Sequence, residues 1–267
     1  MLESDILKQK YKIKNPINSG SFGNCFQGEI IENNASIIIK KISKSKPNFQ
    51  MKIQRETLIP KLIIHPNIIT IIDSFFDDDF HYIIYPAIKN YNTLTNFING
   101  NTSNNLAKII QILCKVVDGI EFMHKNMVIH RDIKPDNIIV NDSEVLIIDF
   151  DLAFVMNNDE FPAGNTVQGT PWFLAPEMWI QAKNIDYKVV DVYAFGILCY
   201  YVFNFERYPY LAETLKELEY AIIYKLPLES ASGNYLMDKL IMKIIRKNPL
   251  RRPSLQLIRE SLMGIIS

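Results

Sequence analysis

The strongest constraint on this chain is the octet HRDIKPDN at residues 130–137. It follows a stretch with helical periodicity and precedes the apolar run IIV at 138–140. Pro135 has no backbone N–H and restricts Lys134 before it to extended geometry, so the octet cannot form the interior of a helix. A loop therefore holds Asp132, Lys134 and Asn137 close together.

These three side chains suit the transfer of a phosphoryl group. That reaction asks for an acceptor for a hydroxyl proton, a positive charge near the moving phosphate and a neutral oxygen ligand for Mg²⁺. Asp132, Lys134 and Asn137 would supply them in that order. Any one of them alone would be typical of a charged surface turn, which is the alternative interpretation.

The composition describes a globular protein without a strong overall charge. The chain has 267 residues, of which 48% are hydrophobic and 22% charged, enough for one large domain or two small lobes. Its formal net charge is zero. No whole-molecule field therefore draws it to nucleic acid or to an anionic membrane, and we expect neither as a partner.

The cysteines and the apolar runs favour a reducing compartment. Cys25, Cys114 and Cys199 are scattered, with no C-x-x-C pair, which argues against a disulfide framework or a zinc site. The first residues carry charges where a signal peptide needs an apolar segment. The longest apolar run, 194–203, is too short to span a bilayer. We expect an intracellular protein, cytoplasmic or nuclear, in the host cell if the chain is viral.

The hydrophobic pattern changes along the chain. Residues 11–42 alternate short apolar runs with breakers, which predicts a hairpin meander. A helix over 49–62, kinked or ended near Pro60, and two strands over 68–76 and 81–85 complete a β-rich part. From Leu106 to Met123 apolar residues recur at steps of three and four, which predicts a long amphipathic helix. Two short strands follow the octet, then an irregular segment to about 177, and helical patterns fill the rest.

Three motifs occur in the order found in one enzyme family. The octet resembles the catalytic loop H-R-D-L-K-x-x-N of eukaryotic-type protein kinases. DFD at 149–151 resembles their D-F-G, and GTPWFLAPE at 169–177 resembles the end of their activation segment. The resemblance implies one domain over 1–267 with the bilobal α+β kinase fold. Its small β-rich N-lobe with one helix would span about 1–86, its hinge 86–90 and its larger helical C-lobe 91–267.

The segment INSGSFGNC at 17–25 resembles the family's glycine-rich loop, G-x-G-x-x-G-x-V, which covers the phosphates of ATP. Glycines let a hairpin backbone approach phosphate oxygens without Cβ clashes. Two positions depart from the motif, because Asn18 replaces the first glycine and Cys25 the valine. A plain glycine-containing turn is the alternative. The residues expected at the nucleotide are Ile17, Asn18, Gly20, Ser21, Phe22, Gly23 and Cys25.

A lysine in the following strand resembles the V-A-I-K lysine of the family. Lys40 lies seventeen residues after Gly23. The resemblance implies that it holds the α- and β-phosphates while paired with a helix carboxylate, for which Glu56 is the natural partner. Lys41 is a competitor for this role.

The resemblance also places residues around the purine. Ile38 stands where the family usually has alanine, so its bulk should narrow the adenine slot. Tyr85 would be the gatekeeper at the back of the pocket. Pro86 lies where the hinge needs only a carbonyl, and the N–H of Ile88 would face the ring.

Asp149 fits the D-F-G aspartate that chelates Mg²⁺ together with Asn137, since a hard cation prefers oxygen ligands. Asp151 in place of glycine restricts the backbone, although aspartate tolerates the left-handed region. Its carboxylate could add metal affinity or could raise the pKa of its neighbour by like-charge repulsion.

Other positions resemble the family's supports. Thr170 would contact Asp132 and, with Lys134, would mark serine/threonine specificity. Glu177 would pair with Arg252, and Asp191 would cap the backbone of the catalytic loop.

Thr166 lies four residues before Thr170, in the segment that resembles the family's activation segment. Arg131 has no fixed counter-ion in the sequence pattern, and such an arginine can order a loop once a phosphate arrives. We predict that Thr166 is an activating phosphosite, modified by an upstream kinase or by autophosphorylation. The alternative is an unmodified loop threonine.

The resulting hypothesis is an ATP- and Mg²⁺-dependent kinase that phosphorylates serine or threonine in a protein substrate. A second interpretation is a pseudokinase that binds nucleotide or partners without turnover, motivated by Asn18, Ile38 and Asp151. A third is a small-molecule kinase of related fold, against which the segment at 169–177 argues, because that segment serves a protein substrate.

Overall fold

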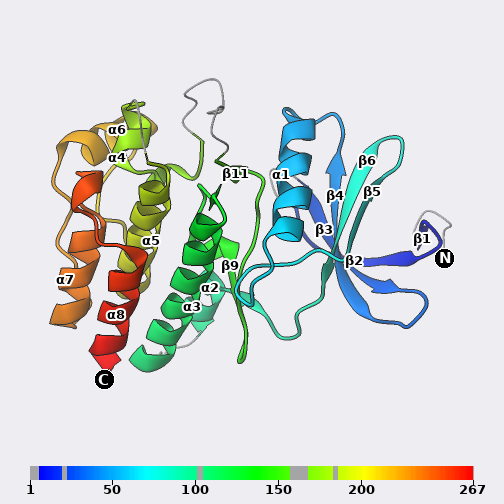
Figure 1. The fold of residues 1–267 in the computed structure, drawn as a ribbon, viewed down its shortest axis with the longest axis horizontal. Coiled ribbons are helices and arrows are strands. Elements are labelled where there is room, and N and C mark those ends of the chain that lie inside the picture. Colours follow the sequence, from blue (N-terminus) through cyan, green and yellow to red (C-terminus); the bar gives the residue numbers. More distant parts are fainter. Residues whose placement is uncertain (1–5, 20–22, 101–104, 157–167, 183–185, 267) are drawn as a thin grey trace.

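The computed structural model describes residues 6–19, 23–100, 105–156, 168–182 and 186–266. Two parts are visible in Figure 1, a sheet part with one helix beside it and a helical part. The sheet part ends with β6 (Phe80–Pro86), and the helical part begins near β7 (Asn92–Thr93). The bilobal α+β architecture expected from the sequence is confirmed.

The sheet part is an antiparallel sheet in the order β1-β2-β3-β4-β6-β5. The hairpin meander predicted over 11–42 is present as β2, β3 and β4. The remaining strands have the bounds β1 (Ile6–Leu7), β2 (Tyr11–Ser19), β3 (Asn24–Ile30), β4 (Ser36–Ser43) and β5 (Asp73–Phe76).

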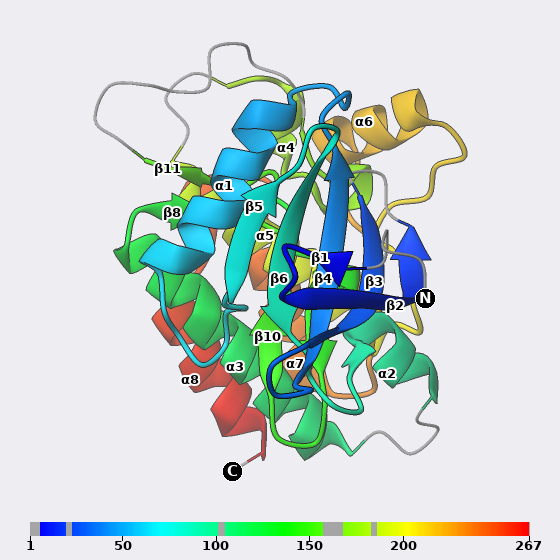
Figure 2. The ribbon, with the colours of Figure 1, turned by 90° about the vertical axis from the view of Figure 1, so that its right-hand side faces the viewer.

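The two faces of this sheet pack against different parts of the molecule. Ile37 and Ile39 alternate onto one face, where they join a small core with Tyr11. The other face presents Ile42 and Ile83, against which helix α1 (Phe49–Leu62) packs through residues of its first turns. Figure 2 shows α1 lying along the sheet. Because strand side chains alternate, Lys40 shares this second face with Ile42.

One detail differs from the expectations for the sheet part. The strand expected over 68–76 begins only at Asp73, because Ile68 forms an isolated bridge with Ile147 of the helical part instead. The amide of Ile69 also donates to the carbonyl of Ile147 at 3.0 Å. The helix predicted over 49–62 is confirmed as α1, and Pro60 lies inside its last turn.

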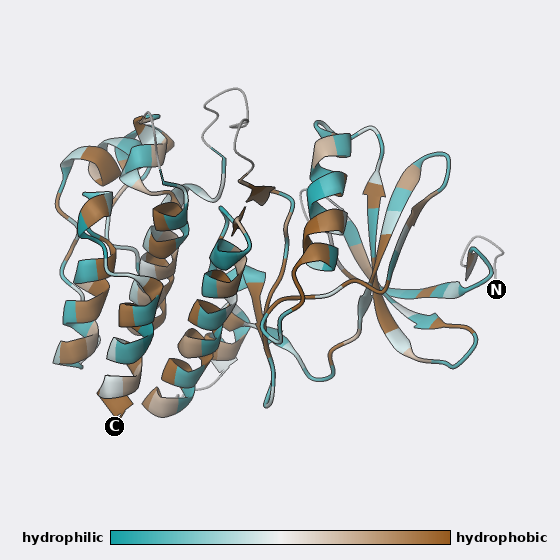
Figure 3. Ribbon diagram, viewed as in Figure 1, coloured by the Kyte–Doolittle hydropathy of each residue, from teal (hydrophilic) through white to brown (hydrophobic). Residues whose placement is uncertain are grey.

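The helical part is built around two helices. α3 (Leu106–Lys125) is the amphipathic helix that the sequence predicts, and α5 (Lys188–Phe203) is buried along most of its length. Brown and teal alternate around α3 and α8 in Figure 3, as expected for helices with one buried face. The other helices are α2 (Leu94–Gly100), α4 (Pro176–Trp179), α6 (Leu215–Tyr224), α7 (Tyr235–Ile244) and α8 (Leu255–Ile266).

Short strands frame the octet at 130–137. It leaves β8 (Val128–Ile129) and runs into β9 (Ile138–Val140), with a 3₁₀ turn over Pro135–Asn137. β9 pairs with β10 (Val145–Ile147), and β8 pairs with β11 (Phe154–Val155). Among the described residues, no helix combines the length and the apolar composition that crossing a bilayer requires.

Candidate active site

The catalytic loop brings its three predicted residues into contact. Lys134 Nζ lies 2.8 Å from Oδ2 of Asp132. Asn137 Nδ2 donates to the same oxygen and to the Asp132 carbonyl, each at 2.9 Å. Pro135 starts the 3₁₀ turn that carries Asn137 back toward Asp132. The loop that the proline imposes therefore assembles the cluster.

Thr170 completes this cluster from a distant segment. Its amide and its hydroxyl donate to Oδ1 of Asp132 at 3.0 and 2.8 Å, and the hydroxyl accepts a bond from Lys134 Nζ at 2.7 Å. Both oxygens of Asp132 are thus held by protein donors, which fixes the plane of the carboxylate. The predicted contact between Thr170 and Asp132 is confirmed.

A buried carboxylate on α5 supports the loop from below. Asp191 is fully buried and accepts hydrogen bonds from the amides of His130 at 3.0 Å and Arg131 at 2.8 Å. His124 Nε2 lies 2.9 Å from the same carboxylate. Burial works to raise the pKa of Asp191, but these partners outweigh it and lower the pKa. The capping role predicted for Asp191 is confirmed.

The second cluster joins the sheet to α1. Lys40 of β4 contacts Oε1 of Glu56, and its Nζ also lies 3.5 Å from Oδ1 of Asp149. Burial would lower the pKa of Lys40, but Asp149 and then Glu56 raise it. Lys41 points elsewhere, with its Nζ 3.9 Å from the centre of the Phe80 ring. Lys40, and not Lys41, therefore makes the predicted pair with Glu56.

Glu56 has a further donor that the sequence did not reveal. The Tyr85 hydroxyl donates to Oε1 of Glu56 at 3.0 Å. Glu56 itself is only 1% exposed, and its Oε2 has no hydrogen-bond partner among the residues that the structure describes. Burial raises the pKa of Glu56 to about 7, against the opposing charge of Lys40. Tyr85, the predicted gatekeeper, thus also orients the Glu56 carboxylate that pairs with Lys40.

Asp149 connects the two clusters. The amide of Ile148 donates to the Asn137 carbonyl at 2.9 Å, which places Asp149 beside the catalytic loop. Its own backbone has a φ of 69°, in the left-handed region. Burial would raise the pKa of Asp149, but Lys40, and after it His130 and Lys134, lower it. Asp149 is therefore kept ionised at the point where the two parts of the molecule meet.

The oxygens of Asn137 and Asp149 fit the binding of an Mg²⁺ ion whose other ligands are phosphate oxygens and water. The amide nitrogen of Asn137 is used by Asp132, which leaves the amide oxygen available beside the ionised Asp149. Within the described ranges no group of three or more His, Cys, Asp or Glu side chains could hold a metal alone. Mg²⁺ usually binds through one or two protein oxygens plus substrate phosphates and water, so two such ligands suffice.

The expected purine residues share one face of the sheet. Ile38 pairs with Tyr85 across β4 and β6, and Cys25 pairs with Lys40 across β3 and β4. Antiparallel partners point to the same side, so these four side chains line the face that carries Lys40. Ile38 and Cys25 are half-buried.

The other described residues predicted to contact the nucleotide lie at or near the ends of the neighbouring strands. Ile17 is in β2 and is 38% exposed, Asn18 lies in the same strand, and Gly23 immediately precedes β3. Pro86 is the last residue of β6, and Ile88 lies two residues further along the chain. Gly20, Ser21 and Phe22 lie outside the described residues.

The expectations for Asp151 need correction. It does not occupy the left-handed region, so the freedom of a glycine is not required there. The like-charge effect also falls on Asp151 itself, whose pKa is raised by burial and then by Asp149. Its carboxylate lies 3.1 Å from Lys52 of α1, a residue that the sequence reasoning did not single out.

Arg131 lies with its guanidinium beside the start of the activation segment. Nε donates to the Leu152 carbonyl at 2.7 Å and Nη2 to Gln168 at 3.2 Å. Burial, and then the charge of Arg55, lowers the pKa of Arg131 to about 10. Thr166 lies outside the described residues.

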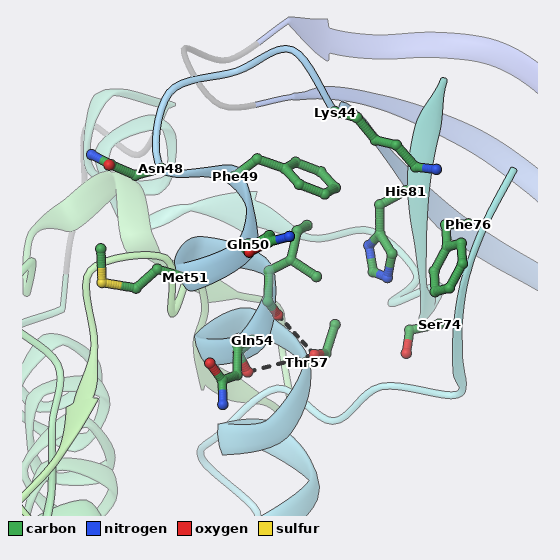
Figure 4. A pocket seen from close by; sticks show the side chains of 11 residues that line it. Lys44, Asn48, Phe49, Gln50, Met51, Gln54, Thr57, Ser74, Phe76 and His81 are labelled. Carbon is green, nitrogen blue, oxygen red and sulfur yellow. Dashed lines mark hydrogen bonds between the residues drawn. The ribbon is translucent and has the colours of Figure 1, made fainter. Parts of the chain in front are cut away.

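A hollow of about 990 Å³ lies between α1 and the strands β5 and β6 (Figure 4). It is lined from α1 by residues such as Phe49 and Thr57, and from the sheet by Ser74, Phe76 and His81. None of the residues predicted to contact the nucleotide lines this hollow.

The predicted bridge between Glu177 and Arg252 is also present. Nη2 of Arg252 donates to Oε2 of Glu177 at 2.8 Å, and Nη1 contacts the other oxygen. Both side chains are buried. This pair ties the end of the activation segment to the segment before α8.

A family model described as the protein kinase domain matches residues 11–262. The chain belongs to the protein kinase family. The resemblance drawn from the octet, from DFD at 149–151 and from residues 169–177 is thereby confirmed over nearly the whole chain.

Several curated proteins are similar to this kinase. R436 of Acanthamoeba polyphaga mimivirus, whose name assigns it to the serine/threonine-protein kinases, is 44% identical over 231 residues, 84% of this kinase and 83% of that protein. The serine/threonine-protein kinase PrkC of Bacillus subtilis is 26% identical, over 94% of this kinase. The serine/threonine protein kinase OSK3 of Oryza sativa is 29% identical, over 96% of this kinase. The matched region is 40% of PrkC and 50% of OSK3.

Proposed function

We propose that this kinase transfers the γ-phosphoryl group of ATP to a serine or threonine hydroxyl of a protein substrate. The observation that carries the proposal is the contact between two clusters. Asp132 is held by Lys134, Asn137 and Thr170, and the Lys40–Glu56 pair meets Asp149 beside that loop.

Each protein group has a role that its surroundings support. Asp132 orients the acceptor hydroxyl and takes its proton, because its carboxylate is fixed in plane by three side chains. Lys134 places a positive charge next to Asp132, where the transferred group must pass. Lys40 holds the α- and β-phosphates. Rates in such sites come mainly from positioning and from charge stabilisation.

Asn137 and Asp149 are the residues that would hold Mg²⁺. The ion, when bound with ATP, would neutralise charge on the phosphate oxygens. Asn137 presents its amide oxygen because its nitrogen is bound to Asp132, and Asp149 stays ionised because Lys40 is close.

A protein substrate and a serine or threonine acceptor are supported by two points. Thr170 and Lys134, which mark this specificity in the family, are in contact here at 2.7 Å. R436, PrkC and OSK3 are named as serine/threonine kinases. The polar residues whose loss would favour a pseudokinase, Lys40, Asp132, Asn137 and Asp149, are present and placed together.

The test is incubation of the purified chain with labelled ATP, Mg²⁺ and a generic basic protein, beside the variant Asp132→Asn. General base catalysis contributes roughly 10²–10⁴-fold, so the variant should lose at least about a hundredfold in rate. Asp136→Asn is the matched control, because Asp136 is an exposed aspartate of the same loop that contacts Thr95.

Acid hydrolysis of the labelled product identifies the acceptor. Phosphoserine or phosphothreonine is expected. Equal incorporation by the wild-type chain and Asp132→Asn would refute the mechanism, and phosphotyrosine as the sole product would refute the acceptor class.

A further inference from the structure

Helix α1 carries a second ion pair one turn before Glu56. Nζ of Lys52 lies 3.1 Å from Oδ2 of Asp151. Residues four apart lie on the same side of a helix, so Lys52 and Glu56 project from neighbouring positions of one face. Glu56 reaches Lys40 in the sheet part, whereas Lys52 reaches the segment after Asp149 in the helical part. α1 is thereby bound to both parts of the molecule.

The partner of Lys52 departs from the family motif. The family motif has glycine at the position of Asp151, and a glycine could not make this contact. Asp151 is only 8% exposed, and the Lys52 side chain is 26% exposed. A pair so covered is screened by salt less than a surface pair.

We propose that Lys52 and Asp151 are positioning residues, whose ion pair holds α1 where Glu56 can meet Lys40 and holds the Asp149 segment against α1. The inference rests on the proposed function, for which these groups must be in contact. Asp151 then acts through α1 and not as a metal ligand. Restoring the glycine of the family motif is therefore expected to impair this kinase.

The first experiment measures turnover of the full chain with ATP, Mg²⁺ and the basic protein. Lys52→Met, Asp151→Asn and Asp151→Gly should each lower kcat about tenfold, the equivalent of about 1.4 kcal/mol, with little change in KM for the protein substrate. The double variant Lys52→Met/Asp151→Asn should lose no more than either single variant, because both remove the same contact. The swap Lys52→Asp/Asp151→Lys should recover most of the loss.

The control is Lys61→Met. Lys61 is an exposed lysine of the same helix whose Nζ lies 3.4 Å from the Ser74 hydroxyl. It should leave kcat within about twofold, the scatter expected of a surface change.

The second experiment does not need catalysis. Amide hydrogen exchange over residues 49–62, without nucleotide, should be faster in Lys52→Met and in Asp151→Asn than in the wild-type chain and Lys61→Met. If the wild-type chain transfers no phosphate, the proposed function fails and the exchange still tests the ion pair. Unchanged exchange in both variants overturns the inference. Full turnover by Asp151→Gly, or losses that add in the double variant, overturns the positioning role.

Discussion

Replacing Arg252 with methionine should destabilise this kinase strongly without touching the site. The guanidinium contacts both oxygens of Glu177 and donates to the carbonyls of Val189 at 2.9 Å, Arg246 at 2.8 Å and Lys247 at 3.2 Å. Methionine keeps much of the volume but leaves the Glu177 charge buried and unpaired. Breaking one partner of a buried pair costs about 3–5 kcal/mol.

Thermal and urea unfolding of the purified variant would measure this. For a chain of this size each kcal/mol moves the melting temperature by about 2–4 °C, so a fall of roughly 6–20 °C is expected from the two estimates. Arg251→Met is the control, because Arg251 is exposed and its loss should cost under about 0.5 kcal/mol. Adding Glu177→Leu to Arg252→Met should restore part of the stability, since no lone charge remains. A fall no larger than that of Arg251→Met would refute the reasoning.

Three further outcomes can be measured. With Glu56 at a pKa of about 7, kcat/KM should fall as the pH drops below neutral, because protonated Glu56 no longer pairs with Lys40. Tyr85→Phe removes a hydrogen-bond donor to the ionised Glu56 carboxylate, so the fall of kcat/KM at acid pH should begin at a higher pH. If the pH of this fall does not change, the role of Tyr85 is contradicted. Ile38→Ala should widen the purine slot and tighten the binding of ATP by about tenfold in calorimetry, within the roughly 1–3 kcal/mol that such pockets discriminate, whereas unchanged affinity would show that Ile38 does not limit the slot. Thr166→Ala should turn over more slowly than the phosphorylated wild-type chain, and undiminished turnover of the unphosphorylated variant would rule out an activating phosphosite.

Local pattern predicted the elements that carry the site. The periodicity over 106–123 corresponds to α3, and Pro135 predicted the loop that gathers Asp132 and Asn137. The choice between Lys40 and Lys41 needed the structure. Adjacent strand residues face opposite sides, and the sequence does not say which side α1 covers.

Local pattern does not predict contacts between distant segments, and those that were predicted, such as that of Glu177 with Arg252, came from the family resemblance. Tyr85 lies 29 residues from Glu56, and Lys52 lies 99 residues from Asp151, so no periodicity relates either pair. The apolar run from Ile68 also predicted a strand over 68–76, which is not formed along its full length. Its first residues instead bond to Ile147, because the run crosses between the two parts of the molecule.

Because Asp191 of α5 holds the backbone of the catalytic loop, the loop moves with the helical part of the molecule. The loop, its support on α5 and Thr170 all belong to the helical part, whereas Lys40 and Glu56 belong to the sheet part. Among the ion pairs of the described residues, those of Lys40 with Asp149 and of Lys52 with Asp151 are the ones that cross between the parts. A rotation of one part against the other would therefore separate Lys40 from Asp149, whereas Asp132 would keep its contacts with Lys134, Asn137 and Thr170.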